Sequence, residues 1–328
     1  MTQNLFEDLT SILDEISEDC KAVPALLSDY DRASYYYVAS RLFQDKGNII
    51  DAGAFLGGTA FTLAEGIKAN PSFDLKHSKH KVISLDLFEV LGENWKTTYP
   101  SMAGLSLGDS FQHLHTHNLT PHADVALSEK LNLMTGDYTS PEPIEVLCLD
   151  VLKSPELTRS CFEIFLPQMI PGESYVLNQD HVHATLPFAI SAFSLFSDIL
   201  TPVGECIHTA AFKYEKAITR EEVSARFENA PNWEKGPRMI AAIKQAIESS
   251  LSDKSRLVYR IALAYAHRRN RSHHEAEAVF LRTLLDERTA LATLDQSEAD
   301  SIQYYIKRFL EHFPRAKQAA RAKRPENV

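Results

Sequence analysis

The chain has 328 residues and a formal net charge of −10 at pH 7, with 34 Lys and Arg against 44 Asp and Glu. Because nucleic-acid affinity depends on an excess of cationic side chains, this balance argues against a general DNA or RNA binder and favours a small-molecule substrate. With 44% hydrophobic residues, 12 Gly and 15 Pro, the composition is that of a globular protein rather than a disordered or repetitive one.

The cysteines and the N-terminal residues predict a protein that is not exported. The four cysteines are widely spaced and form no C-x-x-C pair. Residues 1–20 carry six acidic side chains and no basic one, which is the opposite of a secretory signal. No run of 18 uncharged apolar residues occurs, so no membrane span is expected. We therefore expect a cytoplasmic protein that does not bind membranes.

Helices are predicted for the N-terminal residues 1–45. Apolar residues recur at helical spacing over 4–20, and a second periodic stretch covers about 29–43. The second stretch contains Tyr30, Tyr35, Tyr36 and Tyr37. These tyrosines fit equally well the wall of a substrate pocket or the core-facing side of a helix.

Residues 46–217 change to the hydrophobic pattern of buried strands. Five short apolar runs occur at 47–53, 81–88, 130–137, 144–150 and 174–180, with helical patterns between several of them. This alternation predicts an α/β fold with a doubly wound, Rossmann-like, mostly parallel sheet. Asp51, Asp86, Asp150 and Asp180 lie at or just after strand ends, so we expect them to meet at the carboxyl edge, where such sheets bind ligands.

Residues 218–328 are predicted to form a C-terminal helical extension. They contain amphipathic stretches with few strand signals. We expect these helices to pack on the sheet domain or on a partner subunit, and we expect a homodimer to form through the helical regions.

The segment IIDAGAFLGGTAF (49–61) holds three of the 12 glycines. Gly53 allows a tight turn at the strand end, while Gly57 and Gly58 are expected to let a ligand lie against the main chain. The segment is not a phosphate loop, because no Lys follows. Phe55 stands where a dinucleotide-binding turn needs its second glycine, so nicotinamide and flavin dinucleotides are disfavoured.

The pattern D-x-G-x-x-x-G-G-T, together with the acid that ends the second predicted strand, resembles the class I S-adenosylmethionine-dependent methyltransferases over about residues 45–217. The resemblance implies S-adenosylmethionine as cofactor, with its ribose hydroxyls bound by Asp86 and its adenine amine by Asp137. It also implies that the amino-acid part is held by Asp51, Gly53, Phe55, Gly57, Gly58 and Thr59. The alternative is a doubly wound domain that binds another nucleotide or no ligand.

The segments LDVLK (149–153) and NQD (178–180) are similar to the magnesium-dependent O-methyltransferases of the catechol and macrolide-sugar type. This resemblance implies Mg²⁺ held by Asp150, Gln179 and Asp180. It further implies that Lys153, with a pKa lowered by the metal, deprotonates a hydroxyl of a sugar or secondary metabolite. Gln179 replaces a usual carboxylate, which lowers the expected metal affinity. Without a metal, His181 or His183 is expected to act as the base.

A second hypothesis assigns no catalysis to the chain. The Rossmann-like domain would then be a scaffold, and the helical C-terminal region would recruit a protein partner.

Overall fold

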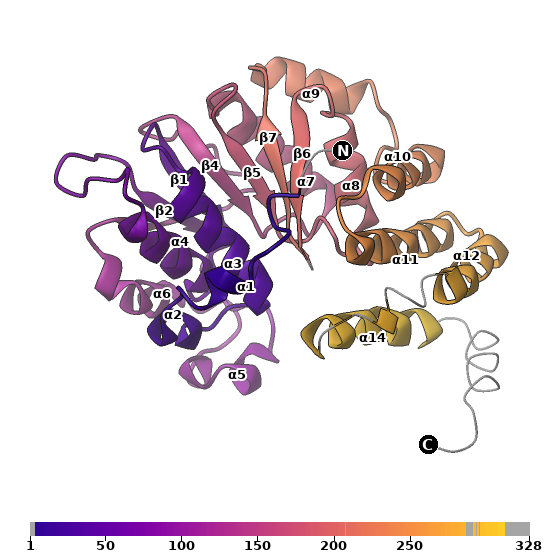
Figure 1. Ribbon diagram of the computed structural model, residues 1–328, viewed down its shortest axis with the longest axis horizontal. Helices are drawn as coiled ribbons and strands as arrows, with labels where there is room; N and C mark the ends of the chain where they lie inside the picture. Colours follow the sequence, from indigo (N-terminus) through magenta and orange to yellow (C-terminus); the bar gives the residue numbers. More distant parts are fainter. Residues whose placement is uncertain (1–3, 207, 287–290, 293, 295, 312–328) are drawn as a thin grey trace.

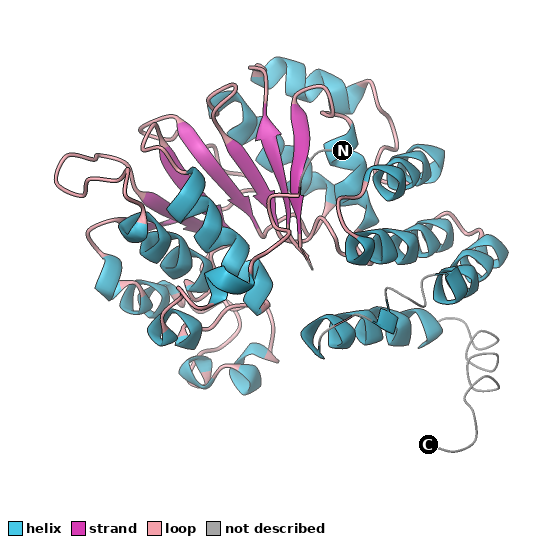
Figure 2. Ribbon diagram, in the orientation of Figure 1, coloured by secondary structure: helices cyan, strands magenta, loops and turns pink. Residues whose placement is uncertain are grey.

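A central sheet with helices on both faces organises the chain (Figures 1 and 2). The computed structural model describes residues 4–206, 208–286, 291–292, 294 and 296–311, so residues 312–328 of the predicted extension lie outside the described residues. Within them, a seven-stranded sheet has the order β3-β2-β1-β4-β5-β7-β6. Strands β1 to β5 pair in parallel, and β7 is antiparallel to both β5 and β6. The predicted mostly parallel, doubly wound α/β fold is confirmed.

Four of the five predicted strands form where the sequence places them: β1 (Asn48–Ala52), β2 (Val82–Asp86), β4 (Ile144–Leu149) and β5 (Tyr175–Asn178). The third prediction was displaced, because β3 is Ala126–Lys130 and residues 131–137 are loop and turn. As an edge strand, β3 is largely exposed and lacks the continuous apolar run of a central strand. Two strands were not predicted: β6 (Leu200–Glu205), an edge strand that contains Pro202, and β7 (Ala210–Tyr214).

Two hydrophobic cores cover the two faces of the sheet. Ile49 and Val146 point into one core, and Ile50 and Leu147 point into the other, as the alternation of strand side chains requires. The helices of the first face are α1 (Thr10–Leu13), α2 (Glu18–Ala22), α3 (Asp29–Tyr37, continued by a π-helical turn, Val38–Leu42), α4 (Gly58–Ala69) and α6 (Gln112–Asn118). The second face carries α7 (Pro155–Phe165), α8 (Pro187–Ser194) and α9 (Arg220–Glu228). A short helix, α5 (Trp95–Thr98), lies between β2 and β3.

The N-terminal cap is tied to the sheet through α3. Its capping box pairs Ser28 with Asp31, and the buried Asp31 also accepts hydrogen bonds from the backbone nitrogen (3.2 Å) and hydroxyl (2.9 Å) of Thr209, just before β7. Tyr35 and Tyr36 are buried in the core, so the core alternative holds for these two tyrosines.

The C-terminal helices are α10 (Gly236–Ser249), α11 (Asp253–Arg269), α12 (His273–Asp286) and α14 (Gln296–Glu311). They pack on the sheet domain: α10 and α11 contact α8, and one continuous core runs from Ile50 in β1 to Phe309 in α14. None of the described helices combines the length and apolar character that a bilayer span requires. The homodimer stays a prediction, because the structure holds one chain.

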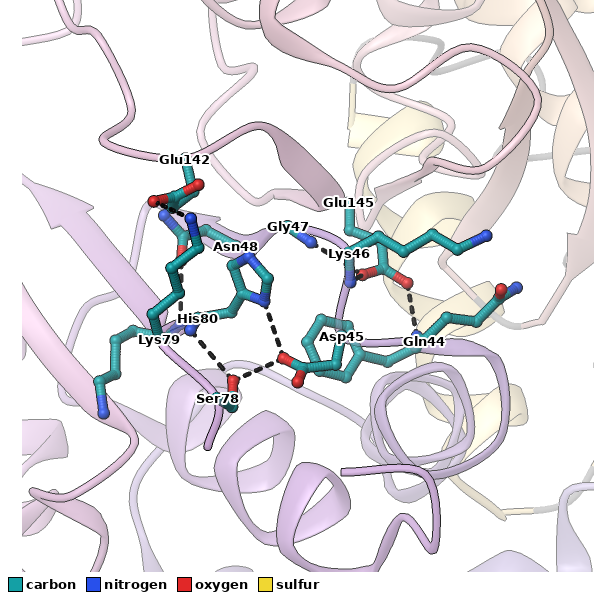
Figure 3. Close-up of polar contacts among 12 residues, drawn as sticks. Gln44, Asp45, Lys46, Gly47, Asn48, Ser78, Lys79, His80, Glu142 and Glu145 are labelled. Atoms are coloured by element: carbon teal, nitrogen blue, oxygen red, sulfur yellow. Dashed lines mark hydrogen bonds and ion pairs between the residues drawn. The ribbon is translucent and has the colours of Figure 1, made fainter. Parts of the chain in front are cut away.

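Two carboxylates fix the chain where it enters β1, at the amino edge of the sheet (Figure 3). Glu145 is buried in β4 and accepts hydrogen bonds from the backbone amides of Gln44 (2.5 Å), Lys46 (2.6 Å) and Gly47 (3.1 Å). Asp45 has φ 61° and is held by Ser78 (2.5 Å) and His80 (2.8 Å). These contacts set the register of β1 and hence the position of the glycine turn at its other end.

Candidate active site at the carboxyl edge of the sheet

The turn between β1 and α4 has the left-handed backbone that its glycines predict. Gly53 has φ 92°, Gly57 has φ 95°, and Phe55 between them has φ 46°. A positive φ is unfavourable for phenylalanine. Its ring is anchored in an aromatic cluster, with ring centroids 5.2 Å from Trp95 and 4.9 Å from Tyr99. Aromatic packing therefore supports the strained turn.

Contacts within the protein account for two of the glycines. A Cβ on Gly53 would lie 2.8 Å from the carbonyl oxygen of Asp150, and a Cβ on Gly58 would lie 2.4 Å from the Cβ of Ala25. Gly58 therefore admits the segment before α3 on the side where a Cβ would point, and the expected contact of its main chain with a ligand stays a prediction. Thr59 is buried in the first turn of α4.

Asp86 ends β2 and holds the same turn. Its Oδ2 accepts a hydrogen bond from the backbone nitrogen of Phe55 (3.0 Å), and its Oδ1 accepts one from that of Phe88 (2.7 Å). Burial raises the pKa of Asp86, and these backbone hydrogen bonds offset part of the rise. The backbone nitrogen of Leu87 also bonds to this carboxylate. Since its two oxygens have about four lone pairs, the carboxylate can still accept a hydrogen bond from a ligand hydroxyl.

Asp51 adds a second buried carboxylate below the turn. It is 1% exposed, and its hydroxyl neighbour Ser84 donates at 3.5 Å. Burial, followed by the charges of Asp150 and Asp86, raises the pKa of Asp51 to about 8. The charges of Asp150 and Asp86 thus act on Asp51 at this edge, and a cationic ligand would favour the ionised form of Asp51.

Lys153 joins the two carboxylates that follow β4 and β5. Its ammonium donates to Asp150 Oδ1 at 2.7 Å and also contacts Asp180 Oδ2. Burial lowers the pKa of Lys153, but the two carboxylates outweigh burial and the net pKa is raised. Burial raises the pKa of Asp150 to about 7 despite the lysine, whereas for Asp180 the cationic neighbours prevail and the pKa is lowered. The lowered lysine pKa that the resemblance implies was expected beside a metal ion, and it stays a prediction.

The residues expected to hold Mg²⁺ do not fit that role. The ammonium of Lys153 lies between Asp150 and Asp180, where the ion was expected. Gln179 uses its Nε2 to donate to the carbonyl oxygen of Leu26 at 2.5 Å, and its Oε1 is buried without a hydrogen-bond partner. No group of three or more His, Cys, Asp or Glu side chains in the described ranges could hold a metal ion. The expected magnesium site is corrected accordingly to a lysine–carboxylate cluster.

His181 does not join this cluster. Its ring is 4% exposed and lies among aromatic rings, with centroids 4.8 Å from Phe193 and 4.9 Å from Phe212. Burial lowers the pKa of His181 to about 3. The ring instead lines a small cavity with Glu205 and residues of α10, within the core of the second face. The sequence did not show that His181 enters this core, because the direction of the chain after β5 decides which face of the sheet receives the side chain.

Asp137 lies away from the site as well. Its side chain is exposed and forms an ion pair with Arg220 at 3.0 Å. Arg220 begins α9 soon after β7, and β7 ends at the amino edge of the parallel strands because it runs antiparallel to them. The expected adenine contact was therefore wrongly placed, since the third strand ends at residue 130 rather than 137.

His208 and Tyr305 are site residues that the sequence analysis missed. The Tyr305 hydroxyl lies 3.3 Å from His208 Nδ1, and the Tyr305 ring lies 5.0 Å from that of His183. Both histidines are near enough to Asp180 to contribute to its lowered pKa. Tyr305 comes from α14, and no spacing in the sequence connects it with residues near 180.

His115 borders the glycine turn from the other side. It is buried in α6, its Cδ2 would lie 3.3 Å from a Cβ on Gly57, and neither ring nitrogen has a hydrogen-bond partner. Burial lowers the pKa of His115 to about 4, so the ring is neutral at pH 7.

The structure of this chain resembles other solved structures, but comparisons of its sequence found no relative. No protein-family model matches the sequence, and no curated protein matches it significantly. One similar solved structure is CalS11, a TDP-rhamnose 3'-O-methyltransferase of calicheamicin biosynthesis (14% identity, 64% of this chain, 93% of that chain, TM-score 0.40). Another is an O-methyltransferase from Bacillus cereus in complex with SAH (15% identity, 65% of this chain, 94% of that chain, TM-score 0.36). A third is an rRNA methylase from Streptococcus thermophilus (16% identity, 59% of this chain, 100% of that chain, TM-score 0.35). All three are methyltransferases. Their low identities and TM-scores leave the chemistry to be argued from this chain's own residues.

Proposed function

We propose that this chain is an S-adenosylmethionine-dependent methyltransferase that acts on a hydroxyl of a small molecule. The observation that carries the proposal is the buried Asp51, placed with Asp86 and Asp150 below a left-handed glycine turn. A sulfonium amino acid brings positive charge to the edge where these carboxylates repel one another. Neutral or anionic nucleotides would leave Asp51 with its raised pKa and largely protonated at pH 7.

Asp51, Asp86 and the main chain of residues 53–57 would hold the cofactor. The unused lone pairs of Asp86 suit the ribose hydroxyls, as the family resemblance implies. When bound, the cofactor supplies a methyl group on a positively charged sulfur, which keeps the bonding electron pair as the methyl leaves.

Lys153 and Asp150 are assigned the chemistry at the acceptor. An ammonium has three N–H donors, and two of them are used by Asp150 and Asp180. The third is available to stabilise negative charge that develops on the acceptor oxygen. Asp150 takes the hydroxyl proton, for which a carboxyl pKa of about 7 is suited near neutral pH. Lys153 is therefore a stabilising cation in this proposal, and not the base.

The surroundings favour a small acceptor. Tyr305 of α14 packs against the ring of His183 and lies 3.3 Å from His208, so a C-terminal helix lies beside the chain that follows Asp180. The net charge of −10 and the carboxylates at this edge would repel a long polyanion.

Calorimetric titration with S-adenosylhomocysteine tests the cofactor assignment. We expect wild-type protein to bind, and we expect Asp86→Ala to weaken binding about tenfold or more, as for the loss of charge-assisted hydrogen bonds. Asp137→Ala is the matched control, because its carboxylate is exposed and paired with Arg220 elsewhere. Absence of binding to the wild type, or equal binding by the Asp86 variant, would contradict the proposal.

A further inference from the structure

Three arginines line one cavity between the C-terminal helices. The cavity has a volume of about 360 Å³ and is bordered by Thr185, Tyr265, Arg268, Arg269 and Arg308. Arg268 and Arg269 end α11, and Arg308 lies in α14, which contacts α11 (Figure 1). We call it the arginine cavity. Such a concentration of positive charge stands out in a chain with a net charge of −10.

The three guanidinium groups are poorly neutralised by the protein. Within the described residues, Arg308 pairs with Glu311 at 3.6 Å. Arg269 donates to the carbonyl oxygen of Thr185 at 3.2 Å, which brings no charge. Burial, together with the adjacent Arg268, lowers the pKa of Arg269. Among the described residues, the carboxylate of Glu311 therefore balances only part of this positive charge.

The arginine cavity adjoins the candidate active site. Thr185 lines the cavity, and its hydroxyl lies 3.0 Å from His183 Nδ1. Tyr265 lines it as well and donates to the carbonyl oxygen of Tyr305 at 3.0 Å. Since His183 and Tyr305 each interact electrostatically with Asp180, a ligand could extend from the acceptor site into the cavity.

We propose that the arginine cavity binds a phosphate or diphosphate group of the acceptor, which makes the acceptor a phosphorylated small molecule with a free hydroxyl. Guanidinium groups form paired hydrogen bonds with phosphate oxygens, and a phosphate carries the multiple charge that three arginines match better than a single carboxylate does. The inference rests on the proposed function for the role of the ligand, but the anion site itself does not depend on it.

Titration calorimetry with inorganic pyrophosphate tests the site on the full chain, at an ionic strength of about 0.15 M. We expect Arg268→Gln and Arg308→Gln each to weaken binding about tenfold or more. Arg268→Lys should bind pyrophosphate more tightly than Arg268→Gln does, because lysine keeps the positive charge but lacks the planar guanidinium that forms paired hydrogen bonds. Arg282→Gln is the control: it removes the same charge from α12, where the exposed Arg282 pairs with Asp286. Equal pyrophosphate binding by the wild type and both Arg→Gln variants, or no binding by the wild type, would overturn the inference.

Parallel titration with S-adenosylhomocysteine separates the two proposals. If S-adenosylhomocysteine binds and pyrophosphate does not, the anion site is wrong while the cofactor assignment stands. If pyrophosphate binds through the arginines and S-adenosylhomocysteine does not bind, the anion site stands and the methyltransferase proposal fails. A short single-stranded RNA that displaces pyrophosphate with higher affinity would overturn the assignment to a small molecule.

Discussion

The side-chain amide of Gln179 donates a hydrogen bond to the backbone carbonyl oxygen of Leu26, 2.5 Å away. This bond joins the carboxyl end of β5 to the segment between α2 and α3. The same segment places Ala25 against Gly58 at the start of α4. The N-terminal cap is therefore fastened directly beside the glycine turn.

Gln179→Ala should loosen this segment. We expect the free energy of unfolding to fall by about 1 kcal/mol, as for one lost hydrogen bond, and S-adenosylhomocysteine to dissociate faster. Stopped-flow dissociation and limited proteolysis at residues 23–27 measure both effects. Gln303→Ala, at an exposed position of α14, serves as the control. An unchanged dissociation rate would show that the segment does not retain the ligand.

Removal of divalent cations should leave the protein functional. Lys153 already supplies the positive charge between Asp150 and Asp180. Dialysis against EDTA is therefore expected to change neither S-adenosylhomocysteine affinity nor methyl transfer once an acceptor is in hand. Activity that disappears with EDTA and returns with Mg²⁺ would show that the lysine moves aside for a metal.

Lys153→Met should separate chemistry from cofactor binding. The change leaves two neighbouring carboxylates without their shared cation, so we expect methyl transfer to fall by about a hundredfold or more. Cofactor affinity should change little, because Lys153 lies outside the glycine turn. The control is Lys130→Met in β3, which removes an exposed lysine paired with Glu89. Equal rates in the wild type and Lys153→Met would rule out the assigned role.

The contribution of Asp51 to the stability of the unliganded protein should fall as the pH rises from about 4 to about 8. The pKa of Asp51 is about 8 in the folded chain against 3.8 for the ordinary group. A raised folded-state pKa contributes stability that is fully present below the ordinary pKa and is lost as pH rises through the folded value. The slope from this group is at most about 1.4 kcal/mol per pH unit.

Urea denaturation at several pH values measures the pH dependence of the free energy of unfolding, and the curve of Asp51→Asn should lack the falling contribution of this carboxyl. Asp8→Asn, at an exposed position near the N-terminus, should keep the wild-type slope. A binding cation should favour ionised Asp51, so affinity for S-adenosylmethionine should rise with pH up to about 8. If the free energy of unfolding depends on pH in the same way in Asp51→Asn as in the wild type, the titration belongs to another group.

Deletion of residues 218–328 should unfold the protein rather than release an independent domain. Phe227, Tyr259 and Phe280 belong to the same core as Ile50 of the central strand. Without them, a large apolar surface of the sheet would face water. Loss of the near-ultraviolet circular dichroism signal and of cooperative unfolding is the expected result. A soluble truncated chain with cooperative unfolding would show that the extension is a separate unit, as the scaffold hypothesis requires.

Local sequence patterns were sufficient to predict the central strands and the glycine turn. β1, β2, β4 and β5 are buried on both faces, so each appears in the sequence as a continuous apolar run. The positions of Asp51, Asp86, Asp150 and Asp180 followed from those strand ends. The glycine turn followed from residue types that alone permit its backbone.

Tertiary structure decided what these side chains do. Lys153 is near Asp150 in the sequence, but only the adjacency of β4 and β5 adds Asp180 and raises the pKa of the lysine. His181 and Asp137 were assigned to the site because they follow predicted strand ends in the sequence. The direction of the chain beyond the strand instead places His181 in the core of one face and Asp137 away from the carboxyl edge. Tyr305 reaches the site because α14 packs on α11 through long-range apolar contacts, and such contacts leave no periodic trace in the sequence.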